Sequence, residues 1–305
     1  MPPPPRRPRP TEGFDPRAVR CVGIVAALHK SRVAAAVREV AGWLAGRGVQ
    51  GLLPAEQADA LSLPELAADP AELPAKADFL LAMGGDGTFL AAARAGAPHR
   101  KPILGVNLGG YGFLAAIPRS GMLKSLEQVM AGELRVEERM MLSARVLRGS
   151  EKVGECWALN DIVVGKGAFS RLFRLETTIS GELVSSFPLD GMIVATPTGA
   201  TGYSLSAGGP VVAPSLRALI VTPICAHALS ARTLVVPASE VIEVAVSDPR
   251  GEEVKLTADG QDSLVLRAGD RVEISEAEFS ARVICPEGVS FYAKLRGKFG
   301  WVGRR

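Results

Sequence analysis

A short glycine-rich stretch made of Gly84, Gly85, Asp86, Gly87 and Thr88 carries the residue types best suited to phosphate chemistry. It follows an apolar run and precedes a helical pattern. Glycines let the backbone approach a phosphate closely, and the start of a helix adds partial positive charge. A carboxylate opposes anion binding, so we expect Asp86 either to accept a proton from an attacking hydroxyl or to hold Mg²⁺. The alternative is a tight turn in which Asp86 caps the helix.

A second glycine-rich loop, residues 105–114, follows the next apolar run. Within it, Asn107 is a candidate hydrogen-bond donor to a ligand. Ligands of open parallel sheets bind beyond the carboxyl ends of the strands, so two such loops on neighbouring strands would form the walls of one cleft. The alternative, that these glycines only make a loop, stays open.

The strongest signal is residues 190–210, which carry no charge after Asp190 and are dense in Gly, Ser and Thr. Such residues offer hydroxyl groups and close backbone approach to a flat, polyhydroxylated ligand such as a nucleotide. Tyr203 adds a ring for stacking and a phenolic hydroxyl. We expect a long functional loop, because loops of this length in a compact domain usually serve function; the alternative is a purely structural loop.

Three other places give weaker signals. Asn160 and Asp161 enter an apolar, strand-like run, which fits either a hydrogen-bonding site at a sheet edge or a turn that starts the strand. Residues 257–261 contain an Asp-Gly pair typical of a hairpin turn, and a turn is favoured there over a ligand site. His227 lies among apolar residues and is expected to be structural. The chain has no GxxxxGK[ST] phosphate loop, which excludes a Walker-type site.

Composition narrows the classes of function. The chain has 305 residues and 47% apolar side chains, enough for two globular domains. Its net charge of +3 is matched by the arginines of the first ten residues, so the remainder is near neutral, which argues against a dedicated nucleic-acid binder. The four cysteines lie far apart with no CxxC spacing, so we expect reduced thiols and neither a zinc site nor disulfides.

Two segments bear on membranes and export. Residues 1–10 combine charge with prolines and lack the apolar core of a secretory signal. Residues 191–216 are uncharged and long enough to span a bilayer, but their glycines and prolines would leave backbone groups unsatisfied in lipid. We therefore expect a cytoplasmic protein with no membrane partner.

The elements that must position these residues change character along the chain. Residues 1–17 are rich in Pro and Arg and are expected to be disordered. Residues 18–136 alternate strand-like runs with helical patterns, which predicts an α/β domain with a parallel sheet and right-handed crossovers. The expected strands are 21–28, 49–53, 78–83 and 101–107, and the expected helices are 33–47, 89–95 and 120–131.

Residues 137–286 have almost no helical periodicity and predict a β-rich domain, built as an antiparallel sandwich. Residues 291–301 look helical again, and we expect the segment 287–305 to pack back on the first domain. The β-type runs that carry this prediction are 141–148, 157–164, 172–180, 231–237, 241–247, 254–258, 263–269, 271–277 and 281–286.

Taken together, these motifs resemble those of the NAD kinase family, and the resemblance covers about residues 78–302. GGDGT alone also occurs in diacylglycerol and sphingosine kinases and in phosphofructokinases, whereas TPTGATGYSLSAGGP is far more specific to NAD kinases. The matching segments, in the order of the family, are GGDGT at 84–88, GVNLGGYGFL at 105–114, LNDIVV at 159–164, DGMIVATPTGATGYSLSAGGPVV at 190–212, TPICAHALSARTLVVP at 222–237 and ADGQ at 258–261.

The resemblance implies transfer of a phosphoryl group from ATP to the 2′-hydroxyl of the adenosine ribose of NAD, which gives NADP. It also implies a Rossmann-like N-terminal domain, a β-rich C-terminal domain and a homo-oligomer, either a dimer or a tetramer. Some members of the family use inorganic polyphosphate, and the motifs leave that choice open. A divalent cation such as Mg²⁺ would be held largely by the phosphates of ATP rather than by a protein metal site.

The resemblance also implies roles for single residues. Asp86 matches the general base of the family, with Gly87 beside it at the dinucleotide, and Asn160 and Asp161 match a pair that holds the dinucleotide. The other ligand contacts expected on this basis are Gly84, Gly85, Thr88, Asn107, Asp190, Thr198, Gln261 and the adenosine-binding residues Thr201, Gly202, Tyr203, Ser204, Leu205 and Ser206.

The chain departs from the pattern of the family at two notable positions. Pro188 stands where many bacterial relatives carry Arg or His, so Arg171 or Arg174 is expected to supply the basic contact. Tyr111 replaces the commoner Leu of the second glycine-rich loop, which would narrow the cleft. Arg94 is a candidate to offset the charge of the transition state.

Two other functions stay open at this point. A lipid kinase that shares GGDGT would need an exposed membrane-binding surface, of which the near-neutral charge gives little sign. A dinucleotide sensor without catalysis would share the binding residues but would not need a base at Asp86.

Overall fold

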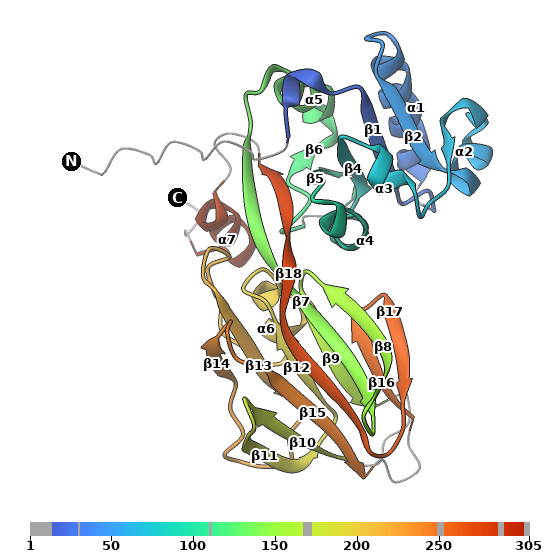
Figure 1. The fold of residues 1–305 in the computed structure, drawn as a ribbon. Helices are drawn as coiled ribbons and strands as arrows, with labels where there is room; N and C mark the ends of the chain where they lie inside the picture. Colours follow the sequence, from blue (N-terminus) through green and yellow to red (C-terminus); the bar gives the residue numbers. More distant parts are fainter. Residues whose placement is uncertain are drawn as a thin grey trace. The chain divides into compact units, whose positions relative to one another are not determined.

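The computed structural model describes residues 14–29, 31–109, 112–166, 173–248, 253–285 and 290–301 (Figure 1). The chain divides into two compact units, each described by itself: unit 1 comprises residues 1–138 and 281–305, and unit 2 comprises residues 139–280. Strands β7 (Arg135–Arg148) and β18 (Asp270–Cys285) carry the chain from one unit to the other. Among the described residues, no helix is both long enough and apolar enough to cross a membrane.

Unit 1 is built on a parallel sheet in the order β3-β2-β1-β4-β5. Its strands are β1 (Cys21–Ala26), β2 (Gln50–Pro54), β3 (Ala67–Ala68), β4 (Phe79–Gly84), β5 (Pro102–Asn107) and the short β6 (Ile117–Pro118). The end of β18 extends the sheet, because Val283 pairs in parallel with Ile103. Every residue of β4 is buried, as expected of a central strand with apolar side chains on both faces. This buried strand leads into the first glycine-rich stretch.

Helices complete unit 1. They are α1 (Ser31–Ala45), α2 (Ala55–Leu61), α3 (Leu73–Lys76), α4 (Asp86–Gly96), α5 (Met122–Ala131) and α7 (Phe291–Phe299). Val37, Val40 and Leu44 recur at helical spacing on α1 and share one buried core with sheet residues such as Ile24. Gly132 ends α5 with a φ of 75°, the left-handed conformation that favours glycine as a helix stop. The predicted α/β class with a mostly parallel sheet is confirmed.

Unit 2 is β-rich, as predicted, and contains two antiparallel sheets. One has the order β14-β13-β12-β9-β16-β17; the other joins β11, β10, β15 and β18, with β7 between β18 and β8. One apolar core contains residues of both sheets, such as Val194 and Leu256 of the first and Val244 and Ile274 of the second. The remaining strands are β8 (Glu151–Ala158), β9 (Asp161–Lys166), β10 (Phe173–Ile179), β11 (Glu182–Leu189), β12 (Gly191–Ala195), β13 (Ala218–Ile224), β14 (Leu234–Pro237), β15 (Ile242–Asp248), β16 (Val254–Ala258) and β17 (Asp262–Leu266).

The structure corrects the expectation that residues 190–210 form one long loop. Residues 191–195 are β12, which is buried at every position between β9 and β13, and residues 203–206 form the short helix α6. The Met-Ile-Val-Ala run of β12 is apolar enough for the centre of a sheet, but the flanking glycines and threonines obscured it. Strands β11 and β13 were also missed, and the two runs expected at 271–277 and 281–286 belong to the single strand β18.

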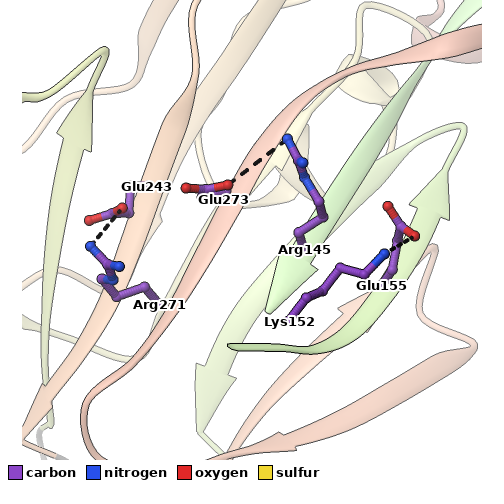
Figure 2. A network of polar contacts seen from close by, with 6 residues as sticks. All are labelled: Arg145, Lys152, Glu155, Glu243, Arg271 and Glu273. Carbon is purple, nitrogen blue, oxygen red and sulfur yellow. Dashed lines mark hydrogen bonds and ion pairs between the residues drawn. The ribbon is translucent and has the colours of Figure 1, made fainter. Parts of the chain in front are cut away.

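Charged side chains of the second sheet of unit 2 form ion pairs. Arg148 makes a bidentate contact with the buried carboxylate of Asp270, at 2.9 and 2.8 Å, and this guanidinium lowers the pKa of Asp270. More exposed ion pairs of this kind contribute only about 0–1 kcal/mol each. Figure 2 shows three such pairs: Arg145 with Glu273 (4.0 Å), Arg271 with Glu243 (3.6 Å) and Lys152 with Glu155 (3.0 Å).

Candidate functional site

In unit 1 the first glycine-rich stretch joins the buried strand β4 to the helix α4. Strand β4 ends at Gly84, Gly85 is the N-cap of α4, and Asp86 is the first helical residue. A side chain at Gly84 would collide with the Thr88 side chain, so glycine at that position lets Thr88 pack closely against the end of β4. The stretch therefore places Asp86 and the N-terminal amides of α4 at the carboxyl end of a parallel strand, where open sheets bind ligands.

The Asp86 carboxylate is held by backbone amides of the second glycine-rich loop. Its Oδ2 accepts the N–H of Phe113 at 2.7 Å, and its Oδ1 accepts those of Leu114 at 3.0 Å and Ala115 at 3.1 Å. A Cβ at Gly112 would collide with this carboxylate, so Gly112 leaves the space that Asp86 occupies. The Asp86 side chain therefore does not simply cap the helix. It links the start of α4 to residues 113–115.

The two glycine-rich loops lie on neighbouring strands, since Gly84 and Asn107 are direct partners in the β4–β5 ladder. The Oδ1 of Asn107 accepts the N–H of Gly109 at 2.9 Å, so its role in this structure includes shaping the loop. Tyr111 lies outside the described residues. Arg94 lies in the last turn of α4, eight residues after Asp86 and so about 12 Å along the helix axis, which does not bring the two together.

In unit 2 a second aspartate holds the segment that contains Asn160 and Asp161. The Asp259 carboxylate accepts the N–H groups of Leu159 (3.1 Å), Asn160 (2.7 Å) and Asp161 (3.3 Å). Asp259 and Gly260 have φ values of 51° and 65° and form the turn between β16 and β17, as the Asp-Gly pair predicted. The turn thus does more than reverse the chain, because its aspartate anchors a loop 98–100 residues earlier in the sequence.

The same segment is also fixed from its other side by Thr196. Its hydroxyl donates to the Leu159 carbonyl at 2.6 Å and accepts the Gly199 N–H at 3.0 Å, while its own N–H donates to the Asn160 carbonyl at 2.9 Å. A Cβ at Gly199 would collide with the backbone of Asn160, so the two segments can approach only with glycine there. Together, Asp259 and Thr196 leave the backbone of residues 159–161 little freedom.

Two buried polar atoms at this place have no hydrogen-bond partner in the part of the chain that the structure describes. They are Oδ1 of Asn160 and Oγ1 of Thr198. Leaving a buried polar atom unpaired costs about 1–3 kcal/mol, so such atoms are rare unless a ligand or water completes them. Both belong to residues that the sequence had suggested as ligand contacts.

Asp161 has an unusual acidity. Its side chain is only 6% exposed, and burial, with a further contribution from the charge of Asp259, raises its pKa to about 7. An aspartate with a pKa this close to neutral is typical of functional sites, although buried structural pairs show the same effect. Near pH 7 this group can therefore present either a carboxylate or a carboxylic acid to a ligand.

Residues 198–200 are buried, whereas residues 201–206 include buried, half-buried and exposed positions. The Ser204 hydroxyl is fully buried and lies 2.9 Å from the hydroxyl of Thr222 on β13, so it anchors α6 rather than reaching outward. Tyr203 is 48% exposed and Ser206 is also exposed. Thr201 donates to the Thr198 carbonyl at 3.4 Å. Of the suggested adenosine contacts, Tyr203 and Ser206 are the side chains that a ligand can reach most easily.

Basic groups lie close to Asp190 and Pro188. Lys166, at the end of β9, contacts the Asp190 carboxylate at 2.6 Å. Arg174 on β10 lies directly opposite Pro188 on β11 and donates to the Ser186 carbonyl at 2.7 Å, so its suggested role as the basic contact stays a prediction. Arg171, the other candidate, lies outside the described residues.

Comparison with known proteins identifies the family. The ATP-NAD kinase N-terminal domain matches residues 22–134, and the ATP-NAD kinase C-terminal domain matches residues 159–285. The chain belongs to the NAD kinase family. The NAD kinase of Moorella thermoacetica is 48% identical over 93% of this chain and 90% of its own length. That of Syntrophotalea carbinolica is 41% identical over 93% of this chain and 99% of its own length.

Solved structures of NAD kinases share this fold. A yeast NADH kinase complexed with NADH superimposes with a TM-score of 0.86 at 23% identity, over 94% of this chain and 89% of its own. An NAD kinase from Archaeoglobus fulgidus in complex with ATP has a TM-score of 0.72 at 26% identity, over 93% of this chain and its full length. The two-domain architecture expected of a NAD kinase is confirmed.

Sequence reasoning missed several residues that position the candidate groups. Thr196, Lys166 and the anchoring role of Asp259 depend on contacts between segments that are distant in the chain. Asp259 had a signal, since it precedes Gly260 in the ADGQ motif, but that signal predicted only a turn. Gln261, taken as a ligand contact, is exposed in the same turn, where its N–H donates to the Ala258 carbonyl at 3.0 Å.

Proposed function

We propose that this NAD kinase family member transfers the terminal phosphoryl group of ATP to the 2′-hydroxyl of the adenosine ribose of NAD, giving NADP, with Asp86 as the general base. The position of Asp86 supports its assignment as the base. Its carboxylate is partly exposed, follows the end of a buried strand and is oriented by three backbone amides. A base that is already oriented can contribute about 10²–10⁴-fold to the rate.

The proton is expected to go to Oδ2 of Asp86. A carboxylate oxygen has about two lone-pair sites, and Oδ1 already accepts two N–H groups, whereas Oδ2 accepts one. As the ribose oxygen bonds to the γ-phosphorus and the bond to the bridging oxygen of ATP breaks, Oδ2 takes the hydroxyl proton. ADP leaves with that bridging oxygen.

Unit 2 supplies groups suited to a dinucleotide. Oδ1 of Asn160 is a buried acceptor and Oγ1 of Thr198 is a buried hydroxyl, so both fit a ligand rich in hydroxyl and amide groups. Asp161, as a carboxylate, can accept hydrogen bonds from a ribose diol. Tyr203 exposes a ring on which an adenine can stack. We propose binding of the adenosine part by residues 201–206, with Asp190 and Gln261 as further contacts.

The phosphoryl donor is expected to bring its own cation. The described residues contain no group of three His, Cys, Asp or Glu side chains that would hold a metal ion by themselves, and Asp86 is already engaged by three amides. Mg²⁺ usually keeps few protein ligands and binds with the substrate's phosphates, so an ion that arrives with ATP fits these residues. The amides at the start of α4, beginning with Gly85 and Asp86, suit phosphate oxygens, as does Gly87, the glycine of its first turn.

The test is NADP formation by the purified protein from NAD, Mg²⁺ and either ATP or polyphosphate. We expect the wild type to form NADP, and Asp86→Asn to lower kcat by about 10²–10⁴-fold while NAD still binds. Asp78→Asn is a matched control: Asp78 precedes β4 at its other end and also accepts two backbone N–H groups, so turnover should be unchanged.

Either of two outcomes would contradict the proposal. Normal turnover by Asp86→Asn would remove the assignment of the base. Folded wild-type protein that binds NAD but forms no NADP with either donor would favour a dinucleotide sensor, and would direct attention to lipid substrates next.

We also propose a homo-oligomer in the cytoplasm. Leu234 and Val235 are 38% and 52% exposed on β14, at one edge of the six-stranded sheet, and such an edge can pair with another copy. The four cysteines are free thiols, which suits a reducing compartment. Light scattering during size-exclusion chromatography distinguishes a monomer from a dimer or tetramer.

A further inference from the structure

The C-terminal helix α7 contacts the segment that holds Asp86. The Lys294 ammonium donates a hydrogen bond to the Phe113 carbonyl at 2.7 Å. Phe113 and Lys294 are 181 residues apart in sequence, yet both belong to unit 1. Phe113 is also the residue whose N–H donates to Oδ2 of Asp86. A charged group from the end of the chain is therefore separated from the proposed base by a single residue.

One peptide group connects the two side chains. The carbonyl of Phe113 and the N–H of Leu114 belong to the same planar peptide, which is trans, so they point in opposite directions. The carbonyl accepts from Lys294, and the N–H donates to Oδ1 of Asp86 at 3.0 Å. A charged donor on the carbonyl fixes the plane of this peptide and polarises its N–H, which strengthens the bond to the carboxylate.

Helix α7 is held where Lys294 can reach this carbonyl. Its first turn is capped by the Ser290 hydroxyl, which accepts the Ala293 N–H at 3.1 Å, and Leu295 is buried. The Lys298 ammonium lies 4.0 Å from the centre of the Phe113 ring, and the Phe299 ring lies 6.3 Å from it. Helix α7 thus contacts Phe113 in two places, at its carbonyl and at its ring.

We propose that Lys294 is a positioning residue for the phosphoryl transfer: through the peptide between Phe113 and Leu114, it keeps the Asp86 carboxylate in the orientation that accepts the substrate proton. This inference rests on the proposed function of Asp86. Lys294 itself does not touch that carboxylate. Its effect should therefore appear in the rate of the chemical step rather than in NAD binding.

The first experiment compares Lys294→Met with Arg296→Met in the full-length protein. Both variants remove one positive charge from α7, but Arg296 is exposed. We expect Lys294→Met to lower kcat by about 10- to 100-fold, the size expected when a reacting group is misplaced, with KM for NAD changed less than about twofold. Lys294→Arg keeps a charged donor and should restore most of kcat. Arg296→Met should behave as the wild type.

A second set of measurements separates this inference from the proposed function. In an Asp86→Asn background, Lys294→Met should cause no further loss, because the group that it positions no longer works as a base. Additive losses would overturn the inference and leave the function of Asp86 intact. Normal kcat in Lys294→Met, or an equal loss in Lys294→Arg, would also overturn it. Normal kcat in Asp86→Asn would instead contradict the proposed function itself.

An NMR chemical shift tests the effect of Lys294 on the peptide between Phe113 and Leu114 without measuring turnover. The amide proton of Leu114 should move upfield in Lys294→Met, since its peptide loses a charged donor on the carbonyl. The same resonance should stay in place in Arg296→Met. A Leu114 resonance that is unchanged in folded Lys294→Met would show that the peptide does not transmit the contact.

Discussion

Asp86 in unit 1 and Asp259 in unit 2 use the same hydrogen-bonding device in different surroundings. Each is the aspartate of an Asp-Gly pair, and each accepts three consecutive backbone N–H groups from a distant loop. Asp86 begins a helix and remains partly exposed. Asp259 lies in a turn with a φ of 51° and is 9% exposed. The hydrogen bonds are alike, whereas the access to ligands differs.

Access decides what each carboxylate can do. Asp86 can still meet a substrate hydroxyl at Oδ2, so the amides that hold it act as a support for chemistry. Asp259 is enclosed, so its three bonds serve the loop: they fix the backbone of Asn160 and Asp161, the two residues proposed to contact the dinucleotide. With Asp86 as the proposed base and Asp259 as an anchor, the two aspartates differ in exposure and not in motif.

The largest expected effect separates these two roles through stability. Asp259→Ala leaves three amides unpaired in a buried place, at about 1–3 kcal/mol each, so we expect the free energy of unfolding to fall by roughly 3–5 kcal/mol. Asp86→Ala should lower it by less than about 2 kcal/mol, because water reaches that site, while abolishing turnover. Urea unfolding of both variants measures the difference. Equal losses would mean that the two aspartates are anchors of the same kind.

Two glycines sharpen the comparison, because each leaves room for one of the anchored groups. At Gly199 a Cβ would meet the backbone of Asn160, and at Gly112 it would meet the side chain of Asp86. A backbone cannot swing aside, so Gly199→Ala should cost roughly 2–3 kcal/mol of stability, within the range known for overpacking. Gly112→Ala should cost less than about 1 kcal/mol but lower kcat about tenfold or more by displacing the carboxylate.

Gly42 provides the control for both glycine variants. It lies within α1, and a Cβ there would meet nothing within 4 Å. Gly42→Ala should raise stability by about 0.5–1 kcal/mol, since alanine favours a helix, and leave kcat unchanged. If Gly112→Ala kept full activity, the Asp86 carboxylate would have to be more mobile than its three amide bonds imply.

The parts of the molecule that sequence could predict are those carried by local pattern. Strand β4 is a run of six buried residues, and glycines and a helix come directly after it. The position of Asp86 at the end of this strand could therefore be predicted from adjacent residues. The Asp259-Gly260 turn and the stop at Gly132 were predictable for the same reason. Together with the motif resemblance, such signals gave the fold class and the candidate base.

The parts that could not be predicted depend on contacts across long stretches of chain. Lys294 reaches Phe113 over 181 residues, and Asp259 reaches Asn160 over 99. No spacing within either segment encodes these pairs. Strand β12 was missed for a different reason: Gly191 and the residues after Thr196 are typical of loops, and they outweighed an apolar run of only four residues. A central strand buried by its neighbours needs little pattern of its own.

The smallest expected effect concerns Asp161, which the anchor Asp259 both holds and perturbs. Its raised pKa of about 7 means that roughly one tenth of Asp161 is ionised at pH 6 and nine tenths at pH 8. If the carboxylate accepts hydrogen bonds from NAD, the Kd for NAD should rise roughly tenfold as pH falls from 8 to 6, because the acid form has lost an acceptor. Calorimetry without ATP measures this, and Asp161→Asn, which cannot titrate, should bind with a flat pH profile. A wild-type Kd that is equally flat would confine Asp161 to the same structural role as Asp259, and of these three aspartates Asp86 alone would then keep a proposed role toward the substrate.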